Sequence, residues 1–250
     1  MSISVIIPAR WASSRFPGKP LAMIAGKPMI QWVYERAKRA ELVDEVIVAT
    51  DDERILAAVH NFGGLGEMTP SELPSGTDRV AFVARKRTAD VIINVQGDEP
   101  LIDPAAVDLA VTTLLSDEKA HMATLVRRLP LGADLDNPNK VRVVLDNFGR
   151  ALYFSRAAVP YARDVEKSLW PAKFPYYEHI GIYAYRRDFL FTFTELPPGP
   201  LEQIEKLEQL RALENGFIIK VGVSTFESVC VDVPNDVIAA AQRMRELKIL

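Results

Sequence analysis

The first segment whose residue types could do chemistry is the basic loop between Ala9 and Pro20. Arg10, Arg15 and Lys19 lie in it, and the small residues between them leave backbone N–H groups accessible to a ligand. Several positive donors combined with close backbone approach are what a polyphosphate needs. The loop has neither the GxxxxGK[ST] spacing of a Walker A loop nor GxGxxG, which disfavours a nicotinamide dinucleotide. A solvated basic loop is the alternative interpretation.

Two carboxylates could add a metal ion to this cationic loop. Asp98 comes just after the apolar run Val91–Val95, and Asp232 comes after a late apolar stretch. Carboxylate oxygens are ligands that Mg²⁺ prefers. Cations and a metal that neutralise charge on a reacting phosphate are what phosphoryl or nucleotidyl transfer requires. The alternatives are a turn aspartate at Asp98 and a helix N-cap at Asp232.

Other polar residues also have two possible interpretations. Ser75 either caps a helix or contacts a base or ribose, and His179 is either a buried structural histidine or a ligand to an acidic substrate. Glu208 and Gln209 fall on the polar arc of a predicted helix over residues 201–215, where a solvated face is the default. His60 and His121 are interpreted as structural, and Cys230 is assigned no chemistry.

Alternating strand and helix patterns must position these residues in the first half of the chain. Short β-branched runs at residues 3–8, 46–49 and 91–95 predict buried strands. Helical patterns follow them, beginning at Pro28, at Asp51 or Asp52, and at Asp103-Pro104. This order predicts a three-layer α/β fold with a mostly parallel sheet. Ligands bind beyond the carboxyl ends of such strands, so the basic loop and Asp98 are expected to converge on one nucleoside triphosphate.

The second half of the chain predicts a smaller mixed or antiparallel portion. Strands are expected at residues 122–126, 141–145, 151–155 and 180–185, with a hairpin turn at 146–149. The helix over 201–215 ends at Gly216. Two late strands, 217–223 and 229–231, precede a closing helix over 237–247. We expect a single domain over residues 1–250, with a core of about 1–127 and 217–250 and an inserted portion of about 128–216.

Composition excludes several classes of protein. The chain has 250 residues, of which 48% are hydrophobic and 25% charged, with a formal net charge of −3. These are globular values, and such a charge draws the chain neither to nucleic acid nor to an anionic membrane. No apolar run reaches the ~18 residues of a membrane-spanning helix. The single cysteine excludes an internal disulfide, and a cytoplasmic location is the simple expectation.

Taken together, these residues and motifs resemble the 3-deoxy-manno-octulosonate (Kdo) cytidylyltransferase family. The similarity runs from about residue 4 to residue 240, and its motifs occur in the expected order. They are residues 10–20 with 26–30, Ser75-Gly76-Thr77-Asp78-Arg79, residues 94–100, Ala151-Leu152-Tyr153-Phe154-Ser155-Arg156, His179-Ile180-Gly181-Ile182-Tyr183 and Leu207-Glu208-Gln209-Leu210-Arg211.

The resemblance implies a reaction and a role for each motif. CTP and Kdo would give CMP-Kdo and diphosphate with Mg²⁺, by in-line attack of the anomeric hydroxyl on the α-phosphate, for lipopolysaccharide biosynthesis. A homodimer of a nucleotide-diphospho-sugar transferase-like fold is implied as well, with residues 128–216 forming the sugar-binding and dimerisation portion. The implied catalytic residues are Arg10, Arg15, Lys19 and Asp98. Nucleotide binding would use Arg10, Arg15, Lys19, Ser75, Gly76, Arg79 and Gln96, sugar binding Arg156, His179, Tyr183, Glu208 and Gln209, and metal binding Asp98 and Asp232.

The chain departs from the family near its C-terminus. Where the family has Gly-Val-Asp-Thr-Pro-Glu-Asp, Cys230 replaces glycine, Val233 threonine and Asn235 glutamate, so Asp232 keeps fewer polar neighbours. Alternative substrates and classes stay open: 8-amino-Kdo, a metal-dependent nucleotide-sugar glycosyltransferase, and a non-catalytic nucleotide-binding protein. A NAD-dependent dehydrogenase is more distant, because the glycine fingerprint is absent.

Overall fold

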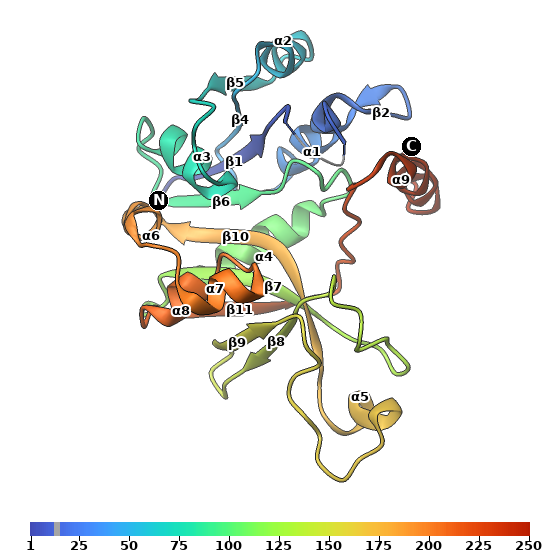
Figure 1. Ribbon diagram of the computed structural model, residues 1–250. Coiled ribbons are helices and arrows are strands. Elements are labelled where there is room, and N and C mark those ends of the chain that lie inside the picture. Colours follow the sequence, from blue (N-terminus) through green and yellow to red (C-terminus); the bar gives the residue numbers. More distant parts are fainter. Residues whose placement is uncertain (13–15) are drawn as a thin grey trace. The chain divides into compact units, whose positions relative to one another are not determined.

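The computed structural model describes residues 1–12 and 16–250 (Figure 1). Residue contacts divide the chain into two compact units. Unit 1 comprises Met1–Asp108 and Ser228–Leu250, and unit 2 comprises Leu109–Glu227. Helix α4 (Pro104–Leu115) passes from one unit to the other. No helix of the described residues is both long and apolar enough to cross a membrane.

Unit 1 contains four parallel strands in the order β6-β1-β4-β5. They are β1 (Ile3–Ala9), β4 (Glu45–Thr50), β5 (Leu65–Met68) and β6 (Val91–Val95). Strands β1, β4 and β6 are apolar and buried along almost their whole length, as expected of parallel strands covered on both faces. The predicted parallel sheet is therefore confirmed, and β5 is an addition that the sequence pattern did not indicate.

Three helices of unit 1 follow its strands, namely α1 (Met29–Ala37), α2 (Glu53–Asn61) and α3 (Gly76–Ala84). Two of them, α2 and α3, begin at capping residues that the sequence predicts. The Asp52 carboxylate accepts a hydrogen bond from the Arg54 N–H at 2.9 Å, and the Ser75 hydroxyl accepts one from the Asp78 N–H at 3.1 Å. Such caps satisfy N–H groups that have no partner inside the helix.

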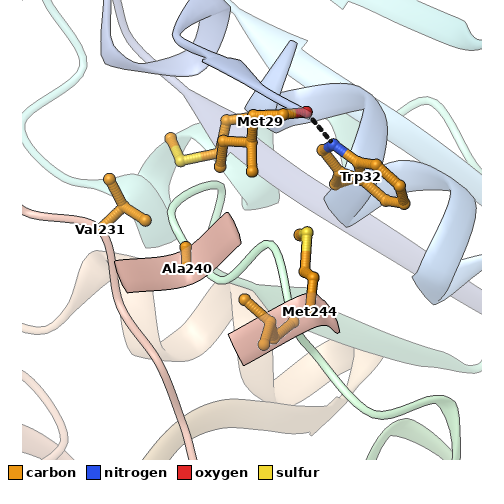
Figure 2. Packing of buried hydrophobic residues seen from close by; sticks show 7 residues of the cluster. Met29, Trp32, Val231, Ala240 and Met244 are labelled. Carbon is orange, nitrogen blue, oxygen red and sulfur yellow. Dashed lines mark hydrogen bonds between the residues drawn. The ribbon is translucent and has the colours of Figure 1, made fainter. Parts of the chain in front are cut away.

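A short connection and the last helix complete unit 1. The connection contains a 3-10 turn, η1 (Lys19–Leu21), and two short strands, β2 (Met23–Ile24) and β3 (Lys27–Pro28). Helix α9 (Pro234–Glu246) brings Ala240 and Met244 into the hydrophobic cluster shown in Figure 2. The other buried members are Ile24, Met29, Trp32, Leu101 and Val231.

This cluster holds the segment that carries Asp232. Val231 is completely buried in it, and the Val231 N–H donates to the Asp98 carbonyl at 3.0 Å. The strand predicted over residues 229–231 is wrong, because residues 226–233 adopt no regular structure. The apolar pattern there reflects burial of Val231 in the cluster rather than pairing in a sheet.

Unit 2 contains a mixed sheet and extends beyond both ends of the inserted portion of about 128–216 that the sequence predicts. Its strands are β7 (Met122–Arg128), β8 (Arg142–Leu145), β9 (Ala151–Ser155), β10 (Tyr177–Arg186) and β11 (Ile219–Ser224). Strand β7 pairs parallel with β11 and antiparallel with β10, while β8 pairs antiparallel with both β9 and β10. The predicted hairpin between β8 and β9 is confirmed.

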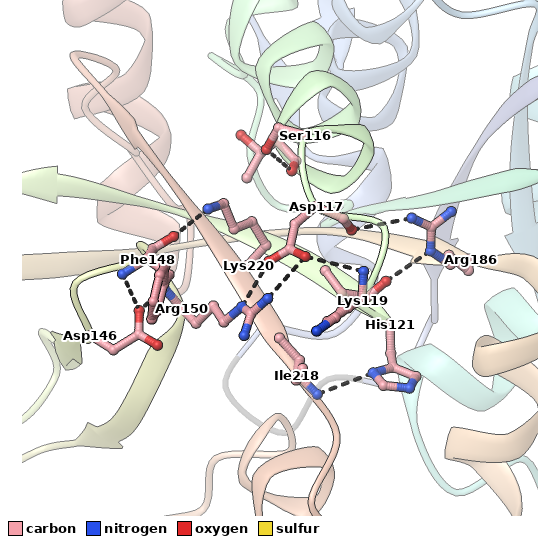
Figure 3. A network of polar contacts seen from close by, with 12 residues as sticks. Ser116, Asp117, Lys119, His121, Asp146, Phe148, Arg150, Arg186, Ile218 and Lys220 are labelled. Carbon is pink, nitrogen blue, oxygen red and sulfur yellow. Dashed lines mark hydrogen bonds and ion pairs between the residues drawn. The ribbon is translucent and has the colours of Figure 1, made fainter.

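A polar network ties distant segments of unit 2 together (Figure 3). The Asp117 carboxylate accepts from the Arg150 Nε at 2.7 Å, and the Arg186 Nε donates to the Ala120 carbonyl at 2.8 Å. His121 accepts the Ile218 N–H at its Nδ1 over 3.2 Å. These contacts give His121 the structural role that the sequence predicts.

The helices of unit 2 differ from the prediction. They are α5 (Trp170–Lys173) after the 3-10 turn η2 (Lys167–Leu169), α6 (Arg187–Glu195), α7 (Pro200–Glu205) and α8 (Leu210–Glu214). The single helix predicted over 201–215 is wrong, because Lys206 adopts the left-handed conformation with φ of 56° and ends α7. Arg211 then reaches back to the Glu202 carboxylate at 2.6 Å, which stabilises the break.

Candidate functional site

The structure brings Lys19 and Asp98 together in unit 1. The Lys19 Nζ lies 2.7 Å from an Asp98 carboxylate oxygen and 3.4 Å from an Asp232 carboxylate oxygen. Lys19 starts η1 directly after Gly18, whose φ of 70° favours glycine, and Asp98 lies in the turn that follows β6. Residues separated by 213 positions thus form one charged cluster.

Two backbone features place the carboxylates of this cluster. A Cβ on Gly97 would lie 2.8 Å from the Pro8 carbonyl oxygen, so glycine permits the Asp98 turn to approach the end of β1. On the other side, the Asp236 carboxylate accepts the N–H groups of Asp232 at 2.8 Å and Val233 at 2.9 Å. Val233, not Asp232, is the N-cap of α9, so the Asp232 carboxylate is not used as a cap.

The same cluster contains donors that could hold a divalent cation. One oxygen each of Asp98 and Asp232 and the Cys230 sulfur all lie within 4.8 Å of one another. The paired carboxylates suit a hard cation such as Mg²⁺, which makes little use of sulfur ligands. The Lys19 ammonium, in contact with both carboxylates, shows that they already hold a positive charge at this point.

The negative charges of Asp98 and Asp232 raise the pKa values of their ionisable neighbours Lys19, Glu99 and Cys230. Burial opposes the charged form of Lys19, but the Asp98 and Asp232 carboxylates outweigh it and raise its pKa. Burial raises the pKa of Glu99 to about 7, and the charges of Asp98 and Asp232 act in the same direction. The Glu99 carboxyl also accepts a hydrogen bond from the Ser228 hydroxyl. Cys230 is an exposed residue, yet shielding of its thiol and the surrounding carboxylates raise the thiol pKa.

The remainder of the basic loop is only partly described. Arg10 is exposed at the end of β1 and lies close enough to Arg79 to disfavour the charge there. Arg15 lies outside the described residues. Trp11 packs against Gly18 and carries the Arg54 guanidinium 3.3 Å from its ring centroid. Arg10 and Lys19 are therefore the predicted cations whose positions the structure gives.

The other predicted nucleotide contacts have protein partners. The hydroxyl of Ser75 caps α3, and Gly76 is the first residue of that helix. Gln96 donates from its Nε2 to the Asn94 side chain at 3.2 Å. Arg79 is completely buried, and its guanidinium pairs with the Asp51 carboxylate at 2.8 Å. The roles of these four residues in nucleotide binding stay predictions.

In unit 2, the predicted sugar-binding residues His179, Tyr183 and Gln209 lie together. The Tyr183 hydroxyl donates to the Gln209 Oε1 at 3.2 Å, and the His179 and Tyr183 ring centroids lie 5.4 Å apart. Gln209 is 3% exposed, and its Nε2 has no hydrogen-bond partner in the described part of the chain. A buried amide with an unused donor calls for a polar ligand atom. Gln209 is therefore not on the solvated helix face that its spacing predicted.

Most of the predicted sugar-binding side chains around His179 are uncharged near pH 7. Burial lowers the pKa of His179 to about 4, so its imidazole is neutral near pH 7 although part of the residue is exposed. Burial and the nearby Glu208 carboxylate raise the pKa of Tyr183. Glu208 itself lies 3.9 Å from the Arg211 guanidinium. These side chains can recognise hydroxyl groups by hydrogen bonds, and none of them except Glu208 is charged.

Arg156 makes a different set of contacts. Its guanidinium donates to three backbone carbonyls, those of Glu205 at 2.7 Å, Pro138 at 2.9 Å and Lys206 at 3.4 Å. Arg156 also lines a cavity of about 410 Å³ that includes Tyr161, Lys167 and Trp170. The Arg156 guanidinium thus connects the end of β9 to the break after α7 by hydrogen bonds. Its predicted contact with a sugar stays a prediction.

Comparison with known proteins decides the family. The family model described as "Cytidylyltransferase" matches residues 4–226. A 3-deoxy-manno-octulosonate cytidylyltransferase of Pelobacter propionicus is 53% identical over 99% of this chain and 99% of its own length. The enzyme of that name from Geobacter metallireducens is 52% identical over the full length of both chains. The chain belongs to the 3-deoxy-manno-octulosonate cytidylyltransferase family.

Solved structures agree with this family and with the predicted fold. A CMP:2-keto-3-deoxy-manno-octonic acid synthetase complexed with CTP is 42% identical, with a TM-score of 0.91 over 98% of this chain and 99% of that one. A putative glucose-1-phosphate thymidylyltransferase from Bacillus anthracis is 16% identical with a TM-score of 0.67, and shows the fold alone. The predicted nucleotide-diphospho-sugar transferase-like fold is confirmed.

Two buried residues of this Kdo cytidylyltransferase family member, Glu99 and Thr124, have partners that the sequence does not indicate. A charged residue at Glu99 beside the apolar pair Leu101 and Ile102 was a signal for burial, and so was a threonine inside the apolar run of β7. Neither signal identifies a partner, because Ser228 and His179 lie far away in the sequence.

Proposed function

We propose that this chain transfers the cytidylyl group of CTP to Kdo, giving CMP-Kdo and diphosphate. Membership in a family of transferases with this name supports the activity. The observation that carries the proposed site is the convergence of Lys19, Asp98 and Asp232 beyond the ends of two parallel strands. This is where a nucleotide binds in open parallel sheets.

The proposed reaction forms one bond and breaks one. The anomeric hydroxyl oxygen attacks the α-phosphorus in line, the bond from that phosphorus to the bridging oxygen breaks, and diphosphate leaves with the electron pair. The hydroxyl proton passes to solvent. Lys19 and Arg10 offset the negative charge of the triphosphate, which otherwise repels the approaching oxygen. Arg15 is proposed to share this role.

Mg²⁺ would be held by the carboxylates of Asp98 and Asp232. When bound, it neutralises phosphate charge and lowers the pKa of a nearby hydroxyl. The closeness of the two carboxylates, one oxygen of each within 4.8 Å of the other, supports this assignment, because two neighbouring negative charges favour bound cations. Ser75, Gly76, Arg79 and Gln96 are proposed to surround the cytidine or the reacting phosphate.

The sugar is proposed to bind in unit 2 through Arg156, His179, Tyr183, Glu208 and Gln209. The buried, unused donor of Gln209 supports a polyhydroxylated ligand at this place. From family membership we further propose a homodimer that supplies activated sugar for lipopolysaccharide assembly in the cytoplasm. The glycosyltransferase alternative is not favoured, because the relatives are named cytidylyltransferases.

The test is a substrate panel read as diphosphate release. CTP, UTP, ATP and GTP are each crossed with Kdo, 8-amino-Kdo and sialic acid, with and without Mg²⁺. We expect release with CTP and Kdo that depends on both substrates and on Mg²⁺. A higher kcat/KM with 8-amino-Kdo than with Kdo would show that 8-amino-Kdo is the preferred sugar. CTP binding without diphosphate release with any sugar would contradict the proposed activity.

A further inference from the structure

Thr124 makes an unusual set of contacts inside unit 2. It lies in β7 and is completely buried. Its hydroxyl oxygen lies 2.9 Å from the Nε2 of His179, 2.8 Å from the carbonyl oxygen of Ile182 and 3.2 Å from the carbonyl oxygen of Ile180. Three polar atoms of β10 thus surround one hydroxyl group.

Counting protons fixes the direction of each hydrogen bond. A threonine hydroxyl has one proton to donate, and carbonyl oxygens can only accept. The proton therefore goes to the Ile182 carbonyl, which is the nearer of the two. The His179 Nε2 must then donate to the Thr124 oxygen. In the opposite arrangement, two oxygen atoms would lie 2.8 Å apart with no proton between them, which is repulsive.

An irregularity in the sheet creates this arrangement. Along the antiparallel pair of β7 and β10, Leu125 pairs with Ile180 and Thr124 pairs with Tyr183, so the register shifts between them. Such a bulge interrupts the ladder and can redirect a side chain next to a functional site. The Thr124 hydroxyl donates to the Ile182 carbonyl at this interruption and simultaneously contacts the ring of His179.

The imidazole of His179 then has one acceptor nitrogen left. The ring is neutral near pH 7, because burial lowers its pKa to about 4, so only one of its nitrogens carries a proton. The Phe154 ring packs edge-on against it with centroids 5.3 Å apart, which limits rotation of the ring. No residue of the described chain makes a hydrogen bond to Nδ1, so that lone pair is available to a ligand.

We propose that Thr124 is a positioning residue that holds His179 in the Nε2–H tautomer and so presents Nδ1 as an acceptor for a hydroxyl group of the sugar substrate. The sugar part of this inference rests on the proposed function, whereas the tautomer part does not. It follows that His179 recognises a hydroxyl group of the acidic sugar and not its carboxylate, because an acceptor nitrogen repels a carboxylate.

The first test is the tautomer itself, measured by long-range ¹H–¹⁵N correlation NMR on the whole chain without substrate. Only His60, His121 and His179 contribute imidazole signals, and the spectrum of His179→Asn assigns the third. We expect Nε2 protonated and Nδ1 unprotonated at pH 7. Thr124→Val should give a mixed tautomer, and Thr124→Ser should restore the original spectrum. A protonated Nδ1 in the wild type would overturn the proposal even if Thr124→Val does not fold.

The second test separates sugar binding from nucleotide binding. In Thr124→Val we expect KM for Kdo to rise about tenfold with KM for CTP unchanged, and Thr124→Ser to recover most of the loss. Thr113→Val, at another buried threonine of unit 2, is the matched control and should leave both values unchanged. A changed tautomer with unaltered KM for Kdo would overturn the sugar contact. If the wild type shows no activity with any sugar, the proposed function is contradicted. The NMR result would still decide the tautomer.

Discussion

Asp98 is the residue on which the proposed chemistry depends most. Its carboxylate contacts Lys19 at 2.7 Å and lies in one cluster with Asp232, and its side chain is 25% exposed. We expect Asp98→Asn to lower kcat by at least about 100-fold, by analogy with other electrostatic groups that stabilise a transition state. Diphosphate release measures kcat, and thermal unfolding should change little.

The matched control for this substitution is Asp90→Asn. Asp90 is also an aspartate of unit 1, but its side chain is 59% exposed and contacts the N-terminal residues. Turnover within a factor of two of the wild type is expected for the control. Near-normal turnover in Asp98→Asn would remove Asp98 from the proposed metal site.

His179 should make the stability of the fold depend on pH. In the unfolded chain its pKa is near the ordinary value of 6.5, whereas in the fold burial lowers it to about 4. Between these values the unfolded chain binds a proton that the folded chain does not. Stability is therefore lost as the pH falls from 6.5 towards 4, by about 1 to 2 kcal/mol because part of the residue is exposed. Urea unfolding at pH 7 and pH 4.5 measures this loss, which should be smaller in His179→Gln. An equal loss in both proteins would contradict the lowered pKa.

At the scale of elements, the turn after β6 depends on the absence of a side chain at Gly97. A Cβ there would lie 2.8 Å from a backbone oxygen of β1, which cannot move away cheaply. Gly97→Ala should displace the Asp98 turn and lower kcat/KM at least about tenfold. Gly132→Ala is the control, since its φ of 76° is strained but no atom lies within 4 Å of the added carbon. The control should lose stability without losing turnover, and a similar profile in Gly97→Ala would contradict the argument.

The break between α7 and α8 depends on a buried ion pair. Arg211 binds Glu202 through two hydrogen bonds of 2.6 and 2.8 Å, and both side chains are at most 12% exposed. Arg211→Met leaves the Glu202 carboxylate buried without its partner, which we expect to cost about 3 kcal/mol of unfolding free energy in urea. The exposed pair of Arg243 and Glu246 provides the control, and Arg243→Met should cost less than about 0.5 kcal/mol. Equal costs would show that the Glu202 pair does not stabilise the break.

How far the elements could be predicted depended on whether local sequence determines them. Asp103-Pro104 and Ser75 mark helix starts by capping alone, and the hairpin of β8 and β9 follows from a four-residue turn, so these predictions are confirmed. The helix over 201–215 failed because Lys206 adopts a left-handed conformation that the leucine spacing does not indicate. The strand over 229–231 failed because Val231 packs on α9.

The same distinction applies to the site. The meeting of Lys19 and Asp98 follows from a general rule, since loops at the carboxyl ends of neighbouring parallel strands lie at one edge. The pairing of Arg79 with Asp51 and the contact of Thr124 with His179 follow from no such rule. They depend on the register of strands and on a bulge, which single-sequence patterns do not specify.

For the molecule as a whole, the net charge does not attract a negatively charged nucleotide, so a local group of cations must do so. The chain carries a formal net charge of −3, so its overall field repels CTP. Binding therefore requires that cations be concentrated at one place, and Lys19 and Arg10 beyond the end of β1 are the described candidates.

A crystal structure of the whole chain with CTP and Mg²⁺ would test this central claim most directly. We expect the triphosphate in contact with the Lys19 ammonium and Arg10, with Mg²⁺ on oxygens of Asp98 and Asp232. A fully occupied CTP whose phosphates lie away from Lys19, with the pair of Lys19 and Asp98 unchanged at 2.7 Å, would contradict it.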